Sequence, residues 1–142
     1  MELEFTRFTP IEPHVWAAPT VSIIREILPA QYMNTQHKVD EALQVHRYEY
    51  YGFKDTDGSF VGFGSLDPQF DEFEEGYEVP YLGVVPEKRA QKYGRVILGY
   101  LETMAKTRGQ TYLYLCDTAT SSTFYESLEY KPKALGFQYK TL

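Results

Sequence analysis

The sequence of 142 residues has very few residues of the types that form disulfides and metal sites. The single cysteine, Cys116, cannot form an intramolecular disulfide, and we expect a packed thiol rather than a nucleophile. The three histidines, His14, His37 and His46, lack the spacing of metal ligands. The sequence therefore predicts neither a disulfide framework nor a bound metal.

Long apolar runs and an excess of positive charge are also missing. No run approaches the roughly 18 apolar residues of a membrane-spanning helix, and no charged-then-apolar leader is present. The net charge of −6 disfavours general nucleic-acid binding, which needs clustered cations. We expect a cytoplasmic protein without membrane or nucleic-acid partners, folded as one domain over residues 1–142.

The most regular pattern in the chain starts at residue 93 and has the spacing of one helical face. Its apolar positions fall at i, i+3, i+4, i+7, i+8, i+11 and i+12. They are Tyr93, Val96, Ile97, Tyr100, Leu101, Met104 and Ala105. This spacing predicts a long amphipathic helix to residue 108, with Gly109 as a left-handed residue after its end.

A polar turn, residues 86–94, connects an apolar strand over residues 77–85 to this helix. Its cations are Lys88, Arg89, Lys92 and Arg95. The first amides of a helix have no intrahelical acceptor, and the helix dipole adds positive potential. The turn is therefore a candidate phosphate-binding site.

The same stretch resembles the acetyl-CoA-binding segment of the GNAT superfamily of N-acetyltransferases. Residues 85–98 are similar to Val-x-Pro-x-x-Arg-x-x-Gly-x-Gly/Ala followed by an apolar helix, with Lys92 in place of the first Gly. A second register, Gln91-x-x-Gly94-x-Val96, restores that Gly but breaks the spacing from Pro to Arg. We prefer the first register.

Residues 117–130 resemble a second signature of this superfamily, which usually begins with Asn and ends with Leu-Gly-Phe/Tyr. Four residues match it: Phe124, Tyr125, Leu128 and Tyr130. Three residues depart from it: Thr118 replaces Asn, Ser121 replaces Ala and Glu129 replaces Gly. The resemblance extends in order over about the last two-thirds of the chain.

The resemblance implies an α/β (α+β) fold with a mixed, mostly antiparallel sheet of six to seven strands, about four helices and a splayed central strand pair. The local patterns agree with this order. They predict strands over residues 2–8, 45–54, 60–66, 77–85, 111–116 and 134–142. They also predict a helix over 20–28, a second from a cap at Asn34 or Thr35 to residue 43, and a turn at 55–58 with Gly58 at positive φ.

Acetyl-CoA is the co-substrate that the resemblance implies. The coenzyme-binding residues that we expect are Val84, Val85, Arg89, Ala90, Gln91, Lys92, Tyr93, Gly94, Arg95, Thr118 and Ser121. A backbone N–H at Val84 or Val85 would donate to the thioester oxygen. Tyr125 is the candidate general acid, since the matching Tyr of the superfamily points at the coenzyme sulfur.

The general base is harder to predict. Glu78 is one residue away from the position where histone-type members carry a Glu, and a bulge near Pro80 could correct its direction. The alternatives are a water relay through tyrosines or backbone carbonyls, and Asp117.

An acidic run and several tyrosines suggest where the acceptor amine would bind. The carboxylates are Asp67, Asp71, Glu72, Glu74, Glu75 and Glu78, which form either a solvated loop or an attractor for a cationic amine. The candidate cleft tyrosines are Tyr48, Tyr50, Tyr51, Tyr77 and Tyr81.

The function that we predict is acetyl transfer from acetyl-CoA to a primary amine on a small molecule or peptide. The alternative is a non-catalytic acyl-CoA-binding or protein-interaction domain of the same fold. A homodimer is one possible assembly.

Overall fold

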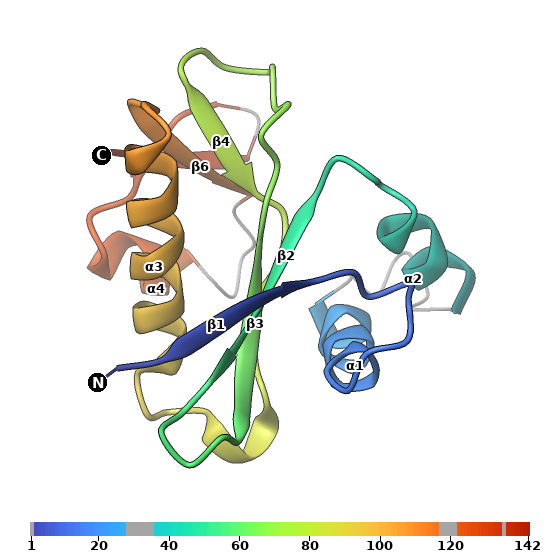
Figure 1. Cartoon of the computed structure of the whole chain (residues 1–142). Coiled ribbons are helices and arrows are strands. Elements are labelled where there is room, and N and C mark those ends of the chain that lie inside the picture. The colour runs from blue at the N-terminus through green and yellow to red at the C-terminus, as the bar shows by residue number, and fades with distance from the viewer. Residues whose placement is uncertain (1, 28–35, 117–121, 135) are drawn as a thin grey trace.

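The computed structural model describes residues 2–27, 36–116, 122–134 and 136–142, with eight strands and four α-helices in these ranges. The strands form two four-stranded sheets (Figure 1). The first is antiparallel in the order β1 (Glu4–Phe8), β2 (Glu49–Lys54), β3 (Phe60–Leu66) and β5 (Leu82–Val84). The second has the order β4 (Gly76–Val79), β6 (Tyr112–Cys116), β8 (Phe137–Thr141) and β7 (Lys131–Pro132).

The strand predicted over residues 77–85 is divided at Pro80, which has no N–H for a strand ladder. Its first half, β4, pairs parallel with β6, and its second half, β5, pairs antiparallel with β3. A single bridge between Asp67 and Glu78 links the end of β3 to β4. The predicted mixed α+β class with a splayed central strand is confirmed, with two sheets in place of one of six to seven strands.

Helices cover both faces of the first sheet. The helices are α1 (Ala17–Ile27), α2 (Gln36–Leu43), α3 (Tyr93–Thr107) and α4 (Ser122–Ser127). Helices α1 and α2 lie on one face of the first sheet, and α3 lies on the other (Figure 1). The prediction that Pro19 precedes the first helix was wrong: Pro19 lies in its first turn, where a missing N–H costs no hydrogen bond. The caps predicted at Asn34 or Thr35 lie outside the described residues.

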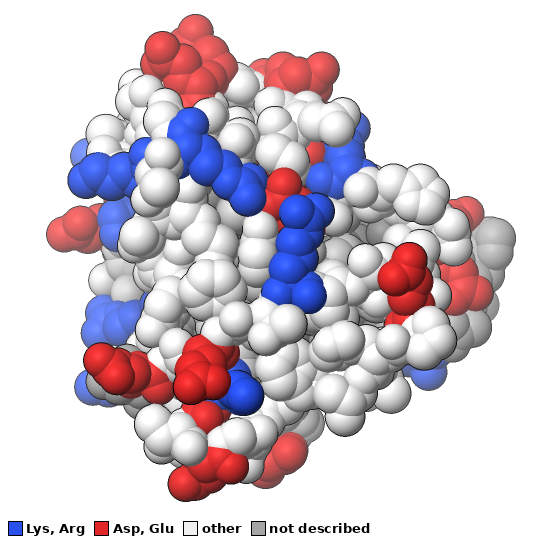
Figure 2. Space-filling model, viewed as in Figure 1, with Lys and Arg blue, Asp and Glu red and all other residues white. Residues whose placement is uncertain are grey.

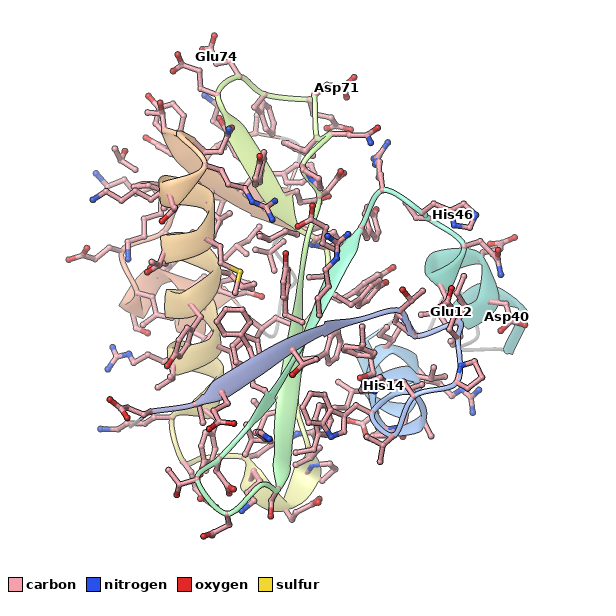
Figure 3. The ribbon with its side chains drawn as sticks, viewed as in Figure 1. Glu12, His14, Asp40, His46, Asp71 and Glu74 are labelled. Carbon is pink, nitrogen blue, oxygen red and sulfur yellow. The ribbon has the colours of Figure 1, made fainter. Side chains whose placement is uncertain are left out.

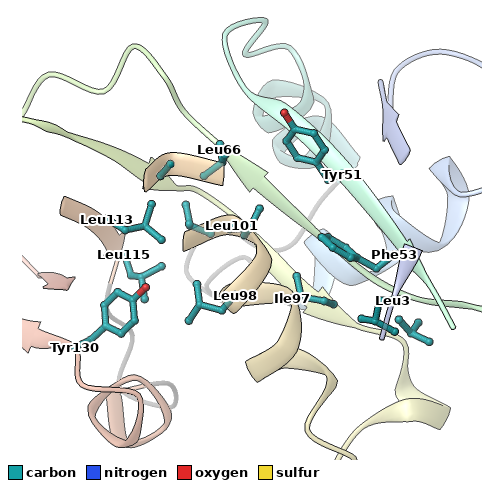
Figure 4. Packing of buried hydrophobic residues seen from close by; sticks show 13 residues of the cluster. Leu3, Tyr51, Phe53, Leu66, Ile97, Leu98, Leu101, Leu113, Leu115 and Tyr130 are labelled. Atoms are coloured by element: carbon teal, nitrogen blue, oxygen red, sulfur yellow. The ribbon is translucent and has the colours of Figure 1, made fainter. Parts of the chain in front are cut away.

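The core has two parts, one on each side of β2 and β3. The part under α3 includes Phe53, Ile97, Leu98, Leu101 and Leu113, all at most 1% exposed (Figure 4). Each such side chain stabilises the fold by roughly 1.5–3 kcal/mol. The part under α1 and α2 includes Ile24, Val39 and Phe63. The β2–β3 hairpin is therefore covered on both sides.

Several boundaries differ from the prediction. Strand β2 begins at Glu49 rather than at residue 45, because a turn closed by a hydrogen bond from Tyr48 N–H to Val45 C=O precedes it. The C-terminal strand β8 begins after Gly136, whose φ is 81°. The left-handed residues predicted at Gly58 and Gly109 are confirmed, both with φ of 83°. No helix in the described ranges is long and apolar enough to cross a membrane.

Candidate active site

Within the described ranges, the break at Pro80 leaves one edge of β5 without a neighbouring strand. On the other edge, Tyr81 C=O accepts a hydrogen bond from Ser65 N–H at 2.9 Å, and Val85 N–H donates to Val61 C=O at 3.0 Å. Backbone groups alternate in direction along an antiparallel strand, so those of Leu82 and Val84 face away from β3. Of the two amides expected to meet the thioester, Val85 N–H is therefore already bonded, and Val84 N–H faces the open side.

The N-terminus of α3 follows β5 after a short 3₁₀ turn, Pro86–Lys88. No side chain caps it, and the first bond of the helix runs from Val96 N–H to Lys92 C=O at 3.2 Å. The amides of Tyr93, Gly94 and Arg95 thus lack intrahelical acceptors, as expected for an anion site.

Two departures from the superfamily signatures retain the backbone of the residue that they replace. Lys92 and Glu129 have φ of 69° and 73°, in the left-handed region that favours glycine. Gly94, which takes the first Gly position in the alternative register, is an ordinary helical residue of α3. The backbone therefore supports the preferred register.

The four cations of the turn differ in their partners. The Lys88 ammonium lies 3.3 Å from the Asp55 carboxylate, and the Arg89 guanidinium donates to Glu26 on α1 at 2.7 Å and to Val84 C=O at 2.9 Å. Lys92 and Arg95 are exposed and have no ion pair within the described ranges. These last two cations are thus the ones available to an incoming anion.

The other predicted coenzyme residues vary in exposure. Ala90 has a left-handed backbone with φ of 63°, and Ala90 and Gln91 are exposed, whereas Tyr93 packs against the core under α3. Thr118 and Ser121 lie outside the described residues, as does Asp117.

Gly94 faces the space between β5 and α4. A Cβ atom at this position would lie 3.6 Å from the Phe124 ring, 3.8 Å from Val84 and 3.9 Å from Leu82. Phe124 is 38% exposed, and the neighbouring Tyr125 packs partly buried against the core under α3. The open edge of β5, the start of α3 and Phe124 on α4 thus surround one region.

Glu78 lies at the end of β4, just before the break, and is partly buried. Burial raises the pKa of its carboxyl to about 7, the Asp67 charge adds to this rise, and Arg47 opposes it. The fully buried Asp67 accepts a hydrogen bond from Arg47 Nε at 2.9 Å. Glu78 was predicted from the sequence as a candidate base, whereas Arg47 was not singled out.

The candidate cleft tyrosines fall into two groups. Tyr48 and Tyr81 have ring centroids 6.3 Å apart, and both pKa values are raised by burial and, in part, by the Glu78 charge, to about 12 for Tyr81. Tyr50 joins this group, which faces α1 and α2. Tyr51 and Tyr77 lie on the other face beside Arg108.

The acidic run is not a uniform solvated loop. Its ends, Asp67 and Glu78, are buried and partly buried, whereas the carboxylates between them are exposed. Figure 2 shows acidic side chains at the top of the molecule, where Figure 3 shows Asp71 and Glu74 pointing outward. Rings beneath hold the loop in place, with Phe70 and Phe73 5.4 Å and 5.2 Å from Tyr114.

The described part of the chain contains no group of three or more potential metal ligands. His14 lies before α1 and His46 after α2 (Figure 3).

Comparison with known proteins gives a family match over most of the chain. The model of the acetyltransferase (GNAT) family matches residues 16–130. The chain belongs to the GNAT family of acetyltransferases. Acetyl-CoA is accordingly its acetyl donor. A comparison with curated protein sequences gives no significant match.

Solved structures share the fold of this GNAT acetyltransferase over nearly its whole length. A GNAT-family protein from Desulfovibrio desulfuricans is 18% identical, with 99% of both chains covered and a TM-score of 0.72. The PaiA N-acetyltransferase from Thermoplasma acidophilum, in complex with coenzyme A, is 15% identical, with both chains fully covered (100%) and a TM-score of 0.71. An aminoglycoside 6′-acetyltransferase type Ii is 26% identical, with 97% of this chain and 96% of that chain covered and a TM-score of 0.66.

Proposed function

We propose that this acetyltransferase transfers the acetyl group to a primary amine of a cationic small molecule or peptide, with acetyl-CoA bound between β5 and α4. The observation that carries the proposal is the break at Pro80. It leaves the Val84 amide on an open strand edge beside an uncapped helix N-terminus.

The residues around the break fit the parts of the coenzyme. Lys92, Arg95 and the first amides of α3 would bind the pyrophosphate, since charge-assisted hydrogen bonds contribute roughly 1.5–3 kcal/mol each. The open edge of β5 would pair with the amide-containing arm. The Cα of Gly94 leaves room for that arm, because no side chain fills the space toward Phe124.

Glu78 is proposed as the general base. An amine must lose a proton to attack the thioester carbonyl, and a carboxyl with a pKa of about 7 is well matched to accept that proton near neutral pH. As the C–N bond forms and the C–S bond breaks, Tyr125 would donate its phenolic proton to the departing sulfur. Glu78 alternates along β4 with Tyr77 and Val79, which pack in the cluster under α3. Tyr125 packs against that same cluster, so base and acid would act from opposite faces of the sheet.

The acceptor is proposed to be cationic because carboxylates surround Glu78. Asp67 and Glu72 both act on its charge, and exposed Asp71, Glu74 and Glu75 extend the negative surface. Such a field raises the local concentration of cations. The name of the 26%-identical neighbour, an aminoglycoside 6′-acetyltransferase, supports a polycationic amine as a starting substrate class.

The experiment is calorimetric titration with acetyl-CoA, followed by a thiol-release screen over cationic, neutral and anionic amines. We expect binding and the fastest release with cationic amines. Binding without release would favour the non-catalytic alternative. A preference for neutral or anionic amines would exclude the proposed acceptor class.

The acidic loop itself is tested by changing Asp71, Glu72, Glu74 and Glu75 together to Asn and Gln. We expect a lower kcat/KM for the cationic amine at low salt and a smaller difference at high salt, because salt screens exposed charges. An unchanged kcat/KM at low salt would mean that the loop is only a solvated surface.

A further inference from the structure

Asp67 directly follows β3, Glu78 lies near the end of β4, and an isolated antiparallel bridge pairs the two residues. Asp67 N–H donates to Glu78 C=O at 2.8 Å, and Glu78 N–H donates to Asp67 C=O at 3.4 Å. Two residues that exchange both backbone bonds in an antiparallel bridge place their side chains on the same face. The two acidic side chains therefore lie side by side rather than across the sheet from each other.

The two carboxylates have unequal partners. Asp67 has no exposed side-chain surface, and its oxygens accept hydrogen bonds from Arg47 Nε at 2.9 Å and from Gln69 N–H at 3.0 Å. Hydrogen bonds and a cation both favour the ionised form of a carboxyl. No hydrogen bond from a cation to the Glu78 carboxylate is found in the described ranges, and burial disfavours its charge.

We propose that Asp67, whose carboxylate pairs with Arg47, is a positioning residue whose charge acts on Glu78, its partner in the bridge between the ends of β3 and β4. A buried like charge disfavours ionisation of its neighbour, so Asp67 acts on Glu78 without touching the substrate. The consequence for catalysis rests on the proposed role of Glu78 as the base. The electrostatic coupling between Asp67 and Glu78 does not depend on that role.

The groups around Glu78 agree with this assignment. Asp67 faces it from the end of β3, Arg47 and Tyr48 from the segment before β2, Glu72 from the acidic loop and Tyr81 from the break. Tyr114 of β6 is the register partner of Glu78, but its hydroxyl donates to Glu74 C=O at 2.8 Å. Arg47 is the one cation among the groups that act on Glu78, and its guanidinium is bonded to Asp67.

The test is an NMR titration of the Glu78 side-chain carboxyl carbon in ¹³C-glutamate-labelled protein without ligands. We expect Asp67→Asn to lower the midpoint of Glu78 by about one pH unit or more, because a neutral amide of the same shape removes the like charge. Asp57→Asn, in the exposed hairpin turn, is the matched control and should leave the midpoint unchanged. An unchanged midpoint in folded Asp67→Asn would overturn the proposal.

Arg47→Gln gives a second test in which the changed side chain is itself 45% exposed. Loss of its positive charge should move the upper titration step of the carboxyl pair to higher pH, opposite in sign to Asp67→Asn. If Asp67→Asn does not fold, the result for Arg47→Gln decides whether the proposal holds. An upper titration step at the same pH as in the unchanged protein would overturn it.

The pH profile of kcat/KM separates this proposal from the role of Glu78 in catalysis. If the coupling and the catalytic role of Glu78 both hold, the acidic limb of the kcat/KM profile moves to lower pH in Asp67→Asn, together with the NMR midpoint of Glu78. If the midpoint moves while Glu78→Gln keeps full activity, the coupling stands and the base is another group.

Discussion

The two halves of the strand broken at Pro80 come from one apolar run but differ in strand pairing and in the charge around them. β4 lies between β6 and the end of β3, and it carries a partly buried carboxyl among other acids. β5 pairs on one edge only, and it leads directly into exposed cations and an uncapped helix. One residue without an N–H thus separates an acidic, closed segment from an open segment with positive charge beyond it.

This difference explains how two reactants of opposite charge could use one strand. The coenzyme phosphates need free amides and cations, which follow β5, and a cationic amine needs carboxylates, which surround β4. The cations after β5 and the carboxylates around β4 are separated only by the length of the broken strand. We therefore expect changes on the β5 side to alter coenzyme binding and changes on the β4 side to alter turnover.

The largest expected effect is on the β5 side, from Gly94→Val. A branched side chain there would fill the space beside Phe124 and Val84, so we expect acetyl-CoA affinity to fall by about 100-fold or more, equal to about 2.7 kcal/mol. Calorimetric titration measures this loss of affinity. Gly99→Val is the matched control in the same helix, because a Cβ at Gly99 meets nothing within 4 Å. Equal affinities of the two variants would contradict the assignment.

On the β4 side, Glu78→Gln should reduce turnover and spare coenzyme binding. Loss of a general base typically lowers rates by about 100-fold or more. We expect kcat/KM for the amine to fall by this factor while the Kd for acetyl-CoA changes less than about twofold. Glu4→Gln, in a surface pair with Lys54, serves as the control. A fall in affinity as large as the fall in turnover would remove the contrast between the halves.

Tyr125→Phe should give a smaller loss of turnover, about tenfold to 100-fold, because a solvent proton can partly replace the phenol. The variant retains the ring that packs under α3. Steady-state kinetics should show a lower kcat with unchanged affinity for acetyl-CoA. Tyr139→Phe in the second sheet is the control. If both kcat and affinity fall equally, Tyr125 is a packing or binding residue instead.

The smallest expected effect comes from single cations of the turn. Lys92→Ala should weaken acetyl-CoA binding by about threefold to tenfold at low salt and less at high salt, because exposed charges are screened. Lys88→Ala should have less effect, since its ammonium already pairs with Asp55. An equal, salt-independent loss in both variants would show that pairing does not distinguish these cations.

The sequence predicted best what depends on neighbouring residues. The periodicity after Tyr93 gave α3, and Gly58 and Gly109 gave the left-handed residues of a hairpin and a helix end. Lys92 could be placed at a glycine position only through the signature, because its own side chain does not favour positive φ. Pro80 indicated that the central strand is interrupted.

What the sequence could not provide was the pairing of distant segments. Which half of the broken strand joins which sheet depends on register, and register is set by the packed partners. The contact between Arg47 and Asp67 was missed for a related reason, since the two residues are 20 positions apart and their contact depends on how the strands pair. The position of Asp67 directly after the apolar strand β3 could have indicated a cationic partner, because a buried carboxylate needs a hydrogen-bond or ion-pair partner.

The most direct test of the division at Pro80 is a backbone amide NMR titration of the ¹⁵N-labelled protein with coenzyme A. The account predicts large shifts for the amides of Val84, Gly94 and Arg95, with little change at Glu78 and Val79 of β4. Shifts confined to β4, or no shifts along β5 and the start of α3 at saturating coenzyme, would contradict it.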